Sequence, residues 1–557
     1  MRKVLKVTAA VLVAVIFFLV LTLPARPLQV PARDGGVAGR TVAGGYHIHT
    51  TQSDGSGDRA AVAAAASRAG LKFVIVTDHG DATRVPDAPA YIDGVLCIDG
   101  VEVSTNGGHY VALGLAAAPY PLGGEPAAVI EDVTRLGGFG FAAHPDSSRP
   151  ELAWTDWSAA LDGVEWLNAD TEWRNESRPR LARVLFDYLV RPGPALASIL
   201  DRPGSTLTRW DALTTVRRVT AIAGHDAHGG FARGAEYRGT RQAAWAPGIP
   251  SYEASFRSFS TRVVLNAPLT GTADVDAPAV IAAIRSGRMF TAVDALAAPA
   301  SLEFHATRGT TTASMGDLVA PGPASIDVDA AVPAGARTVL LRNGEEVSAA
   351  DGGALHMQIP AAHGAYRVEV QLRGAPGRPP VPWLVSNPIY FLEPPAPPAA
   401  GKTVDSILLE PSVPWHVEKD RGSTGSVVAS VPEVAFYYRL RGPSRGSQFV
   451  AAVADLQGRA PAAGAITFTA QAVRPGRVSV QLRYRGGGGK RWGRSVYLDS
   501  TPRDIVVPVG DLLPADRQTG PPPSATTATS LLFVVDLTNA LPGSANTVRI
   551  SRVGFAR

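Results

Sequence analysis

Short apolar runs alternate with helix-like stretches between Tyr46 and about Pro299, and this alternation most narrows the folds open to the chain. Runs such as Phe73–Thr77 and Thr220–Ala223 have the length and the β-branched content of buried strands. Helix-like stretches such as Arg59–Ala69 lie between them. Because strands separated by helices tend to pair in parallel, the pattern predicts a parallel α/β sheet or barrel over this region.

The chain changes character after about residue 300, where runs typical of β-strands replace the mixed pattern. Ser325–Val332 and Tyr366–Leu372 are strand-like, and Asn343-Gly344 is a dipeptide typical of a two-residue hairpin turn. We therefore expect three further units, namely a β-sandwich over residues 300–392, a Pro-rich linker over residues 393–402 and a second, jelly-roll-like sandwich over residues 403–557.

The N-terminus carries a membrane-targeting pattern, with Arg2, Lys3 and Lys6 preceding the uncharged run Val7–Leu23. A helix of this length spans about 26 Å, which is at the short end of the range for a bilayer. A cleaved signal peptide and a retained anchor both fit, and we expect the anchor over residues 1–25, with a tether over residues 26–45. The rest of the chain would then lie in the cell envelope, on the exported side of the cytoplasmic membrane, or be secreted after cleavage.

Composition excludes two classes of function. A formal net charge of +4 over 557 residues gives no support for a general nucleic-acid binder, and we expect no specific duplex partner. The single cysteine, Cys97, excludes an intrachain disulfide and any zinc or iron–sulfur site built on cysteine. A metal site in this chain must therefore use histidine and carboxylate side chains.

Histidines gather at the ends of the predicted strands, and seven of the eleven lie between His47 and His228. His47 and His49 are two residues apart, so on a strand both imidazoles face the same side. Asp226 and His228 repeat this spacing after another apolar run. Because open α/β sheets and barrels place their sites at the carboxyl ends of their strands, we expect these side chains to meet there.

One histidine at a strand end is more often a hydrogen-bonded structural residue than a ligand, and for His109 or His225 alone that is the better interpretation. Five separate strand ends, however, each present a histidine or a carboxylate toward one face. Nitrogen and oxygen ligands of this kind suit Zn²⁺, Mn²⁺ or Fe²⁺, and they exceed what one tetrahedral ion needs. The sequence therefore predicts two to three divalent metal ions and a hydrolytic reaction.

Six short motifs resemble, in order, those of the PHP (polymerase and histidinol phosphatase) superfamily. They are His47-x-His49-Thr50, Ser53-Asp54-Gly55, Thr77-Asp78-His79, Gly100-Val101-Glu102, Ala143-His144-Pro145 and Gly224-His225-Asp226-Ala227-His228. The segments Tyr366–Val370 and Ser386–Tyr390, together with the helix end Ala283–Arg288, resemble the carbaryl-hydrolase-like (CehA/McbA) branch. The resemblance implies a distorted (β/α)7 barrel over residues 46–299 with a trinuclear metal site, followed by the two all-β sandwiches.

Carried over to this sequence, the ligands of the family fall into three sets. The first set would be His47, His49, Glu102 and Asp226. The second set would be Glu102, His144 and His109, where the ligand role of His109 is the less certain because it follows Glu102 by only seven residues. The third set would be Asp54, His79 and His228.

Three more residues are candidates for a part in the reaction. Asp78 would fix the orientation of a ligand, although a turn-capping role also fits. His225 stands where the family usually has serine, so it would lie behind the ligands or face the substrate. Arg149 could clamp an anionic substrate, although an exposed loop arginine is the simpler interpretation. Glu165, on a strand that resembles one of the family, is interpreted as structural.

A second cluster lies near the C-terminus, where basic residues such as Arg483, Arg491 and Arg494 alternate with Trp492 and Tyr497. A hairpin of this composition could contact a glycan or a polyanion. A solvated basic hairpin is the simpler interpretation.

The favoured function is hydrolysis of an anionic small-molecule phosphoester, of the nucleotide or oligonucleotide type, by a hydroxide that bridges the metals. The physical argument is charge, since two or three divalent cations outweigh three ligand carboxylates and would favour an anionic substrate. A carboxyl- or carbamate-ester metallohydrolase is the first alternative. An envelope glycan-binding protein with a passive barrel is the second.

Overall fold

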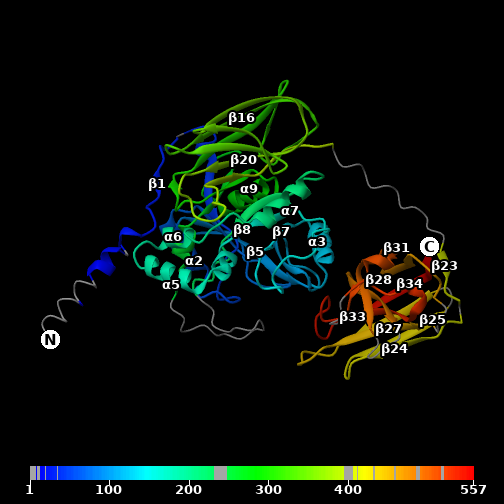
Figure 1. Cartoon of the computed structure of the whole chain (residues 1–557). Coiled ribbons are helices and arrows are strands. Elements are labelled where there is room, and N and C mark those ends of the chain that lie inside the picture. Colours follow the sequence, from blue (N-terminus) through cyan, green and yellow to red (C-terminus); the bar gives the residue numbers. More distant parts are fainter. Residues whose placement is uncertain are drawn as a thin grey trace.

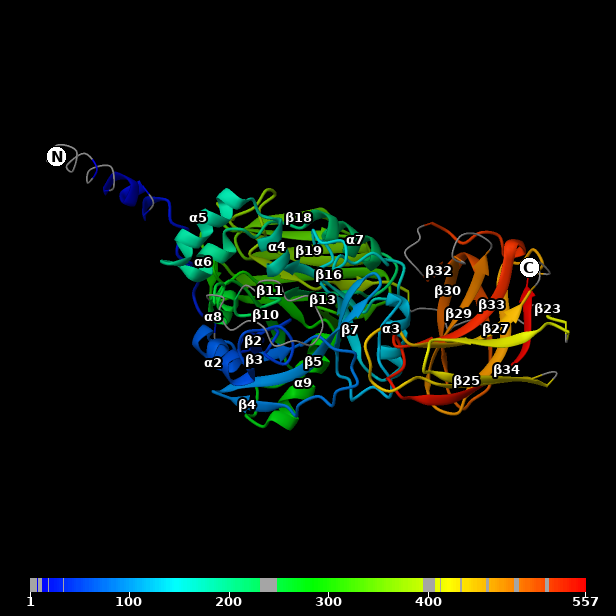
Figure 2. The same cartoon turned by 90° about the horizontal axis from the view of Figure 1, so that it is seen from below.

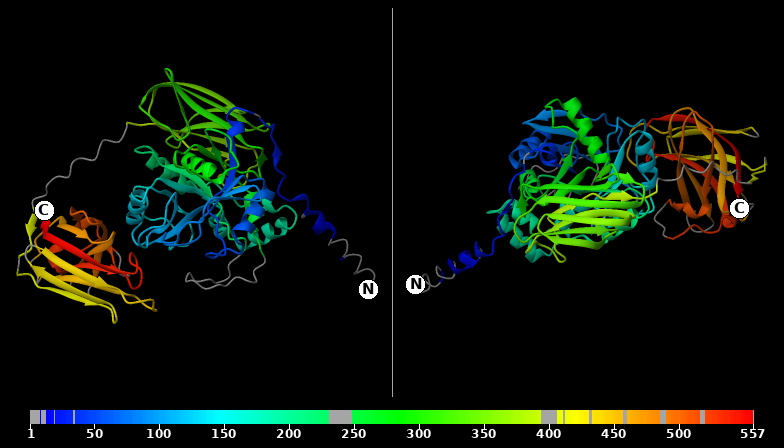
Figure 3. Two further views of the ribbon diagram at one scale, coloured as in Figure 1. Left: turned by 180° about the vertical axis from the view of Figure 1, so that it is seen from behind. Right: turned by 90° about the horizontal axis from the view of Figure 1, so that it is seen from above.

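The computed structural model describes residues 8, 13–18, 20–33, 35–230, 248–393, 406–410, 412–430, 433–456, 460–484, 490–515 and 520–556. The fold is a mixture of α and β structure dominated by large β sheets (Figure 1). The C-terminal strands, coloured yellow to red, form a lobe of their own beside the central body (Figure 3).

Seven strands of the central body follow one another in a single sheet. They are β2 (Thr41–Gly45), β3 (Phe73–Val76), β5 (Val95–Thr105), β6 (Gly108–Leu113), β7 (Phe139–Ala142), β8 (Gly163–Asn168) and β9 (Thr220–Gly224). Neighbours pair in parallel except β6, which is antiparallel to both β5 and β7. A parallel bridge between Ile48 and Ala227 brings the two ends of this row together.

Helices cover this row less regularly than the predicted (β/α)7 alternation requires. They are α2 (Arg59–Ala69), α3 (Pro126–Arg135), α4 (Ala169–Asn175), α5 (Arg178–Tyr188), α6 (Pro192–Ala197), α7 (Gly204–Thr214), α8 (Tyr252–Phe256) and α9 (Ala273–Arg285). The connections from β3 to β5 and from β7 to β8, both described throughout, contain no helix. Each carries two prolines, Pro86 and Pro89 in the first and Pro145 and Pro150 in the second, and proline disfavours a helix interior.

The first β region continues the central sheet instead of standing apart from it. β10 (Ser260–Val264) and β11 (Met289–Ala292) lead from β2 to β21 (Leu384–Ser386), and from there to β20 (Gly364–Gln371) and β22 (Ile389–Phe391). A separate four-stranded sheet contains β13 (Ser301–Arg308), β14 (Thr311–Ser314), β16 (Gly322–Ala331) and β19 (Ala354–Ala362). The proposed boundary at residue 300 stays a prediction.

The described residues of the C-terminal lobe form two six-stranded sheets. The first contains β23 (Ser406–Leu408), β25 (Thr424–Ser430), β26 (Glu433–Arg439), β28 (Ala465–Ala472), β31 (Arg503–Pro508) and β34 (Ala545–Ala556). The second contains β24 (Trp415–Lys419), β27 (Phe449–Asp455), β29 (Gly476–Tyr484), β30 (Arg491–Leu498), β32 (Leu513–Pro514) and β33 (Ala528–Asp536). Phe436, Phe468, Phe533 and Phe555 form part of the apolar core that holds this lobe together.

The predicted N-terminal membrane anchor is wrong. No helix among the described residues combines the length and the apolar character needed to cross a membrane. The predicted location, anchored in the cytoplasmic membrane by this helix, is therefore wrong as well. Within the expected tether, residues 26–45, β1 (Leu28–Gln29) pairs with β12 (Ala297–Ala298) and β2 pairs with β10 of the central sheet. Residues 394–402 of the predicted linker lie outside the described residues.

Candidate metal centre

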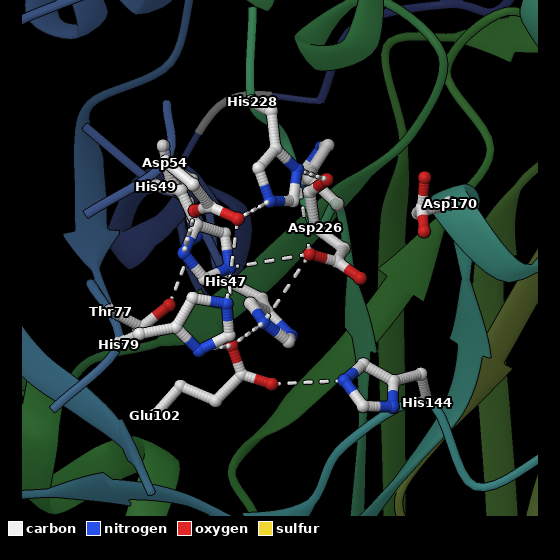
Figure 4. Close-up of polar contacts among 12 residues, drawn as sticks. His47, His49, Asp54, Thr77, His79, Glu102, His144, Asp170, Asp226 and His228 are labelled. Atoms are coloured by element: carbon white, nitrogen blue, oxygen red, sulfur yellow. Dashed lines mark hydrogen bonds and ion pairs between the residues drawn. The ribbon is translucent and has the colours of Figure 1, made fainter. Parts of the chain in front are cut away.

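Nine side chains predicted as ligands come together at the edge of the sheet that holds the carboxyl ends of its parallel strands (Figure 4 labels all of them except His109). Four overlapping groups have ligand atoms within 4.8 Å of one another. These groups are His49, Asp54, His79 and His228; His47, Glu102 and His144; His47, His49 and Asp226; and His79, Glu102 and His109. The overlap means that the nine side chains form one connected cluster.

Glu102, on β5, lies at the centre of the cluster with a side chain only 1% exposed. Its Oε1 lies 2.7 Å from His109 Nδ1 and 2.9 Å from His144 Nε2. Its Oε2 lies 3.1 Å from His79 Nδ1, 3.2 Å from His49 Nε2 and 3.3 Å from His47 Nε2. One carboxylate therefore faces imidazoles that come from four different segments of the chain.

The two aspartates complete the cluster on the side of the cavity described below. Asp226 Oδ1 lies 3.3 Å from His49 Nε2 and 3.5 Å from His47 Nε2. Asp54 Oδ2 lies 3.3 Å from His228 Nε2 and 3.6 Å from His79 Nε2. Each aspartate thus belongs to one group, and histidines of that group also belong to a second group.

Backbone strain accompanies the cluster. His47, His144 and Asp226 have φ values of 62°, 32° and 48°, in the left-handed region that non-glycine residues rarely adopt. Each such residue costs on the order of 1–3 kcal/mol unless the surrounding fold holds it in place. These left-handed residues turn the backbone just past the strand ends, and their side chains belong to the cluster.

The close contacts between imidazoles and carboxylates in the cluster shift the pKa values of both kinds of group. Burial lowers the pKa of His49, but the carboxylates of Asp226 and Glu102 outweigh it and raise that pKa to about 10. Burial also raises the pKa of Glu102, but the surrounding imidazoles, His79 and His47 first, hold it well below its ordinary value. Positive charge is therefore strongly favoured at this point, whether protons or a cation supply it.

A second observation, independent of the pKa shifts, also indicates that the cluster residues could bind a cation. His47 Nε2, His49 Nε2 and Glu102 Oε2 are buried, and within the described residues none of these atoms has a hydrogen-bond partner. Buried polar atoms are normally paired, so three such atoms converging on one point indicate a missing ligand. The buried histidine and carboxylate groups could therefore hold metal ions.

Glu165, on β8, has a larger part than its interpretation as structural suggested. Its Oε1 accepts a hydrogen bond from His47 Nδ1 at 2.6 Å, and its Oε2 accepts one from the backbone N–H of His144 at 2.7 Å. These contacts orient two members of the cluster from behind, as carboxylates behind metal-bound imidazoles do. A buried glutamate inside an otherwise apolar strand was the available signal in the sequence.

Asp78 lies outside the four groups and holds the turn between His49 and Asp54. Its carboxylate accepts hydrogen bonds from the backbone N–H and the hydroxyl of Thr50, each at 2.7 Å, and from the Ser53 hydroxyl. The side chain therefore positions the segment that carries two cluster residues.

His225 is directed away from the cluster. Its Nε2 lies 3.0 Å from the carbonyl oxygen of Phe259, and its ring stacks on the Phe259 ring with centroids 4.4 Å apart. Burial lowers the pKa of His225 to about 4, so the ring is neutral near pH 7. The imidazole is therefore engaged in packing beside the cluster.

A cavity of about 800 Å³ opens on Asp54, Asp226 and His228. Arg149 is exposed at its edge, between Ser148 and Glu151. The centre therefore has a space beside it large enough for a small-molecule ester.

The basic and aromatic residues predicted as a second cluster near the C-terminus do not form one site in the structure. Tyr484 and Trp492 belong to the core of the C-terminal lobe, and Arg483 pairs with Glu418. Arg494 pairs with Glu125 of the central body, and the Arg135 guanidinium lies 3.4 Å from the centre of the Tyr497 ring. Arg485 and residues 486–489 of the predicted hairpin lie outside the described residues.

Comparison with known proteins finds no matching family model and no matching curated protein. A two-domain protein from Bacteroides vulgatus that contains a predicted PHP-like metal-dependent phosphoesterase is 14% identical over 62% of this chain and 95% of its own, with a TM-score of 0.28. A family 11 carbohydrate-binding module of a Clostridium thermocellum cellulase is 15% identical over 28% of this chain and 96% of its own, with a TM-score of 0.22. TM-scores this low do not establish a shared fold, and neither similarity shows the carbaryl-hydrolase-like branch.

Proposed function

We propose that this chain is a metal-dependent hydrolase of phosphoesters. One observation carries the proposal, namely that nine imidazole and carboxylate side chains form overlapping ligand groups around the buried Glu102. Such a set is larger than one ion needs, and nitrogen and oxygen donors suit Zn²⁺, Mn²⁺ or Fe²⁺. We expect two to three ions per chain, held by these nine residues.

When bound, divalent cations supply an activated water molecule and positive charge beside the phosphoryl oxygens. Hydrolysis then adds water across the ester: the water oxygen bonds to phosphorus, the bond to the organic oxygen breaks, and that oxygen takes up a proton. The chain's own residues hold this arrangement. Glu165 orients His47 and the backbone of His144, and Asp78 holds the turn that carries Asp54.

Charge favours an anionic ester over a neutral one. Two or three divalent cations bring a formal charge of about +4 to +6, and the carboxylates of Asp54, Glu102 and Asp226 offset about three of it. The face toward the cavity should therefore stay positive, which attracts a phosphate more strongly than a neutral carbonyl.

The test is a comparison of esters of one phenol. Protein loaded with Zn²⁺ or Mn²⁺ would be given p-nitrophenyl phosphate, bis-p-nitrophenyl phosphate and p-nitrophenyl acetate. We expect a higher kcat/KM for a phosphate ester than for the acetate, and competitive inhibition by inorganic phosphate. The reverse ranking without phosphate inhibition would contradict the proposal.

A carboxyl- or carbamate-ester hydrolase is the second candidate. The observation in its favour is that much of the cavity beyond the cluster is lined by apolar side chains, which accept a neutral organic group. The same comparison separates the two, since this alternative predicts turnover of the acetate and indifference to inorganic phosphate.

A further inference from the structure

The cavity beside the metal centre has two unlike sides. Asp54, Asp226 and His228 line the side of the cluster. The helices α4, α5 and α6, which lie between β8 and β9, each contribute an apolar side chain to the other side. The apolar side chains there, together called the apolar wall, are Leu152, Trp173, Leu181, Leu196, Ile199 and Leu200. Asp170, at the start of α4, also lines the cavity, and Figure 4 shows it on the Asp226 side of the cluster.

The apolar wall is held in place by the packing behind it. Leu196 and Ile199 belong to a core cluster with Val184 and Tyr188 of α5, and both are at most 7% exposed. Packed side chains of this kind sit in fixed rotamers, so the wall exists before a substrate arrives. A preformed surface costs little conformational entropy on binding.

The charged residues at this end of the cavity are partly neutralised among themselves. Arg174 forms an i,i+4 ion pair with Asp170 on α4. Such a pair offers a bound ligand less charge than a single arginine would. An ester that is polar throughout, such as a nucleotide, would leave the apolar wall in contact with water or with unmatched polar groups.

We propose that the apolar wall binds the organic part of the ester, so that the preferred substrates are phosphoesters carrying a bulky apolar group. The inference rests on the proposed function and narrows it from phosphoesters in general to amphipathic ones. Burying one methylene is worth about 0.8 kcal/mol, or about fourfold in affinity. A chain of several methylenes should therefore produce a large and easily measured preference.

The experiment compares methyl p-nitrophenyl phosphate with hexyl p-nitrophenyl phosphate on the full-length, metal-loaded protein. Both diesters release the same phenolate, so their intrinsic reactivities are matched and only the apolar group differs. We expect kcat/KM to be at least thirtyfold higher for the hexyl diester. Equal values for the two diesters would overturn the apolar wall while leaving phosphoester hydrolysis supported.

A pair of variants on α5 locates the effect. Leu181 is half-buried and lines the cavity, whereas Leu185, one turn further, is 40% exposed. Leu181→Gln should reduce the ratio of hexyl to methyl kcat/KM at least fivefold. Leu185→Gln is the matched control and should leave both values unchanged. An unchanged ratio in Leu181→Gln would contradict the assignment.

Failure of the proposed function would look different. If neither diester is hydrolysed while p-nitrophenyl acetate is, the phosphoester assignment is wrong. The wall is then tested by binding alone, through calorimetric titration of the Zn²⁺-loaded protein with hexylphosphonate and methylphosphonate. Tighter binding of hexylphosphonate, lost in Leu181→Gln, would support the wall, and equal binding would overturn it.

Discussion

At the scale of single residues, the centre depends on carboxylates that serve several partners at once. Glu102 faces imidazoles from four segments, and Glu165 contacts both His47 and the segment of His144. Removing one such group therefore affects more than one ligand. This sharing makes the effects of substitution large and non-additive.

Substituting a cluster residue tests the metal centre directly. His47→Ala and Asp226→Ala should each lower the metal content and reduce kcat at least 100-fold, because each removes a donor from a shared group. Elemental analysis and the phosphate-ester assay measure the two effects. His416→Ala, at an exposed histidine of the C-terminal lobe, is the control and should change neither. Active wild-type protein with one ion or none would refute the cluster.

The pKa of Glu172, on α4, makes the free energy of unfolding depend on pH. Burial, together with the Asp201 carboxylate, raises its pKa from 4.5 to about 8. Between these values the folded chain holds a proton that the unfolded chain has lost. The stabilisation is therefore complete below pH 4.5 and is lost as pH rises to about 8.

Glu172→Gln should remove this dependence, because glutamine cannot ionise. The expected difference in slope is at most about 1.4 kcal/mol per pH unit for one proton. Denaturant unfolding of the wild type and the variant at several pH values between 5 and 8 measures it. Parallel curves for the two proteins would show that Glu172 is ionised in the folded state.

At the scale of elements, β9 leaves room for the Glu165 side chain of the neighbouring strand β8. Gly224 is the last residue of β9, and a Cβ added there would lie 2.5 Å from Glu165 Oε1. Glycine at this position therefore allows Glu165 to stay against His47. The close approach links the end of one strand to the orientation of a ligand on another.

Gly224→Ala should displace Glu165, lower stability by about 1–3 kcal/mol and weaken metal binding. Thermal unfolding and metal titration measure the two effects. Gly204→Ala, where nothing lies within 4 Å of the added Cβ, is the matched control and should leave both unchanged. Metal affinity equal to that of the wild type in Gly224→Ala would argue against an orienting part for Glu165.

At the scale of the whole molecule, the C-terminal lobe is fastened to the central body beside α3 (Figure 2). The Arg477 side chain is fully buried, lies 2.8 Å from Asp132 and also pairs with Glu131. Asn539 donates hydrogen bonds to the carbonyl oxygens of Pro121 and Gly123. The lobe is therefore a packed part of the structure and contacts the segment just before α3.

Arg477→Ala should loosen this attachment, because it leaves Asp132 buried without one of its partners, at a cost of about 3 kcal/mol. We expect faster hydrogen exchange in α3 and earlier thermal unfolding of the C-terminal lobe. Arg549→Ala, which removes an exposed ion pair with Glu433 within the lobe, is the control and should have little effect. Unchanged exchange in α3 would mean that the attachment does not depend on Arg477.

Local patterns in the sequence were enough to predict that nine histidine and carboxylate side chains meet, and that mixed α/β structure gives way to β strands. Both follow from short-range rules, since apolar periodicity marks the strands and parallel strands bring their carboxyl ends to one edge. The ligand roles and the domain boundaries stay predictions. The N-terminal anchor, drawn from a local pattern of the same kind, was wrong.

Only the tertiary structure decided the features that join distant parts of the chain. Glu165 meets His47 across 118 residues, and Arg477 meets Asp132 across 345. The direction of His225, toward Phe259 and away from its neighbour Asp226, depends likewise on a residue 34 positions later in the chain, just before β10. Such contacts are selected by packing and by the pairing of buried charges, which no spacing within a short motif encodes.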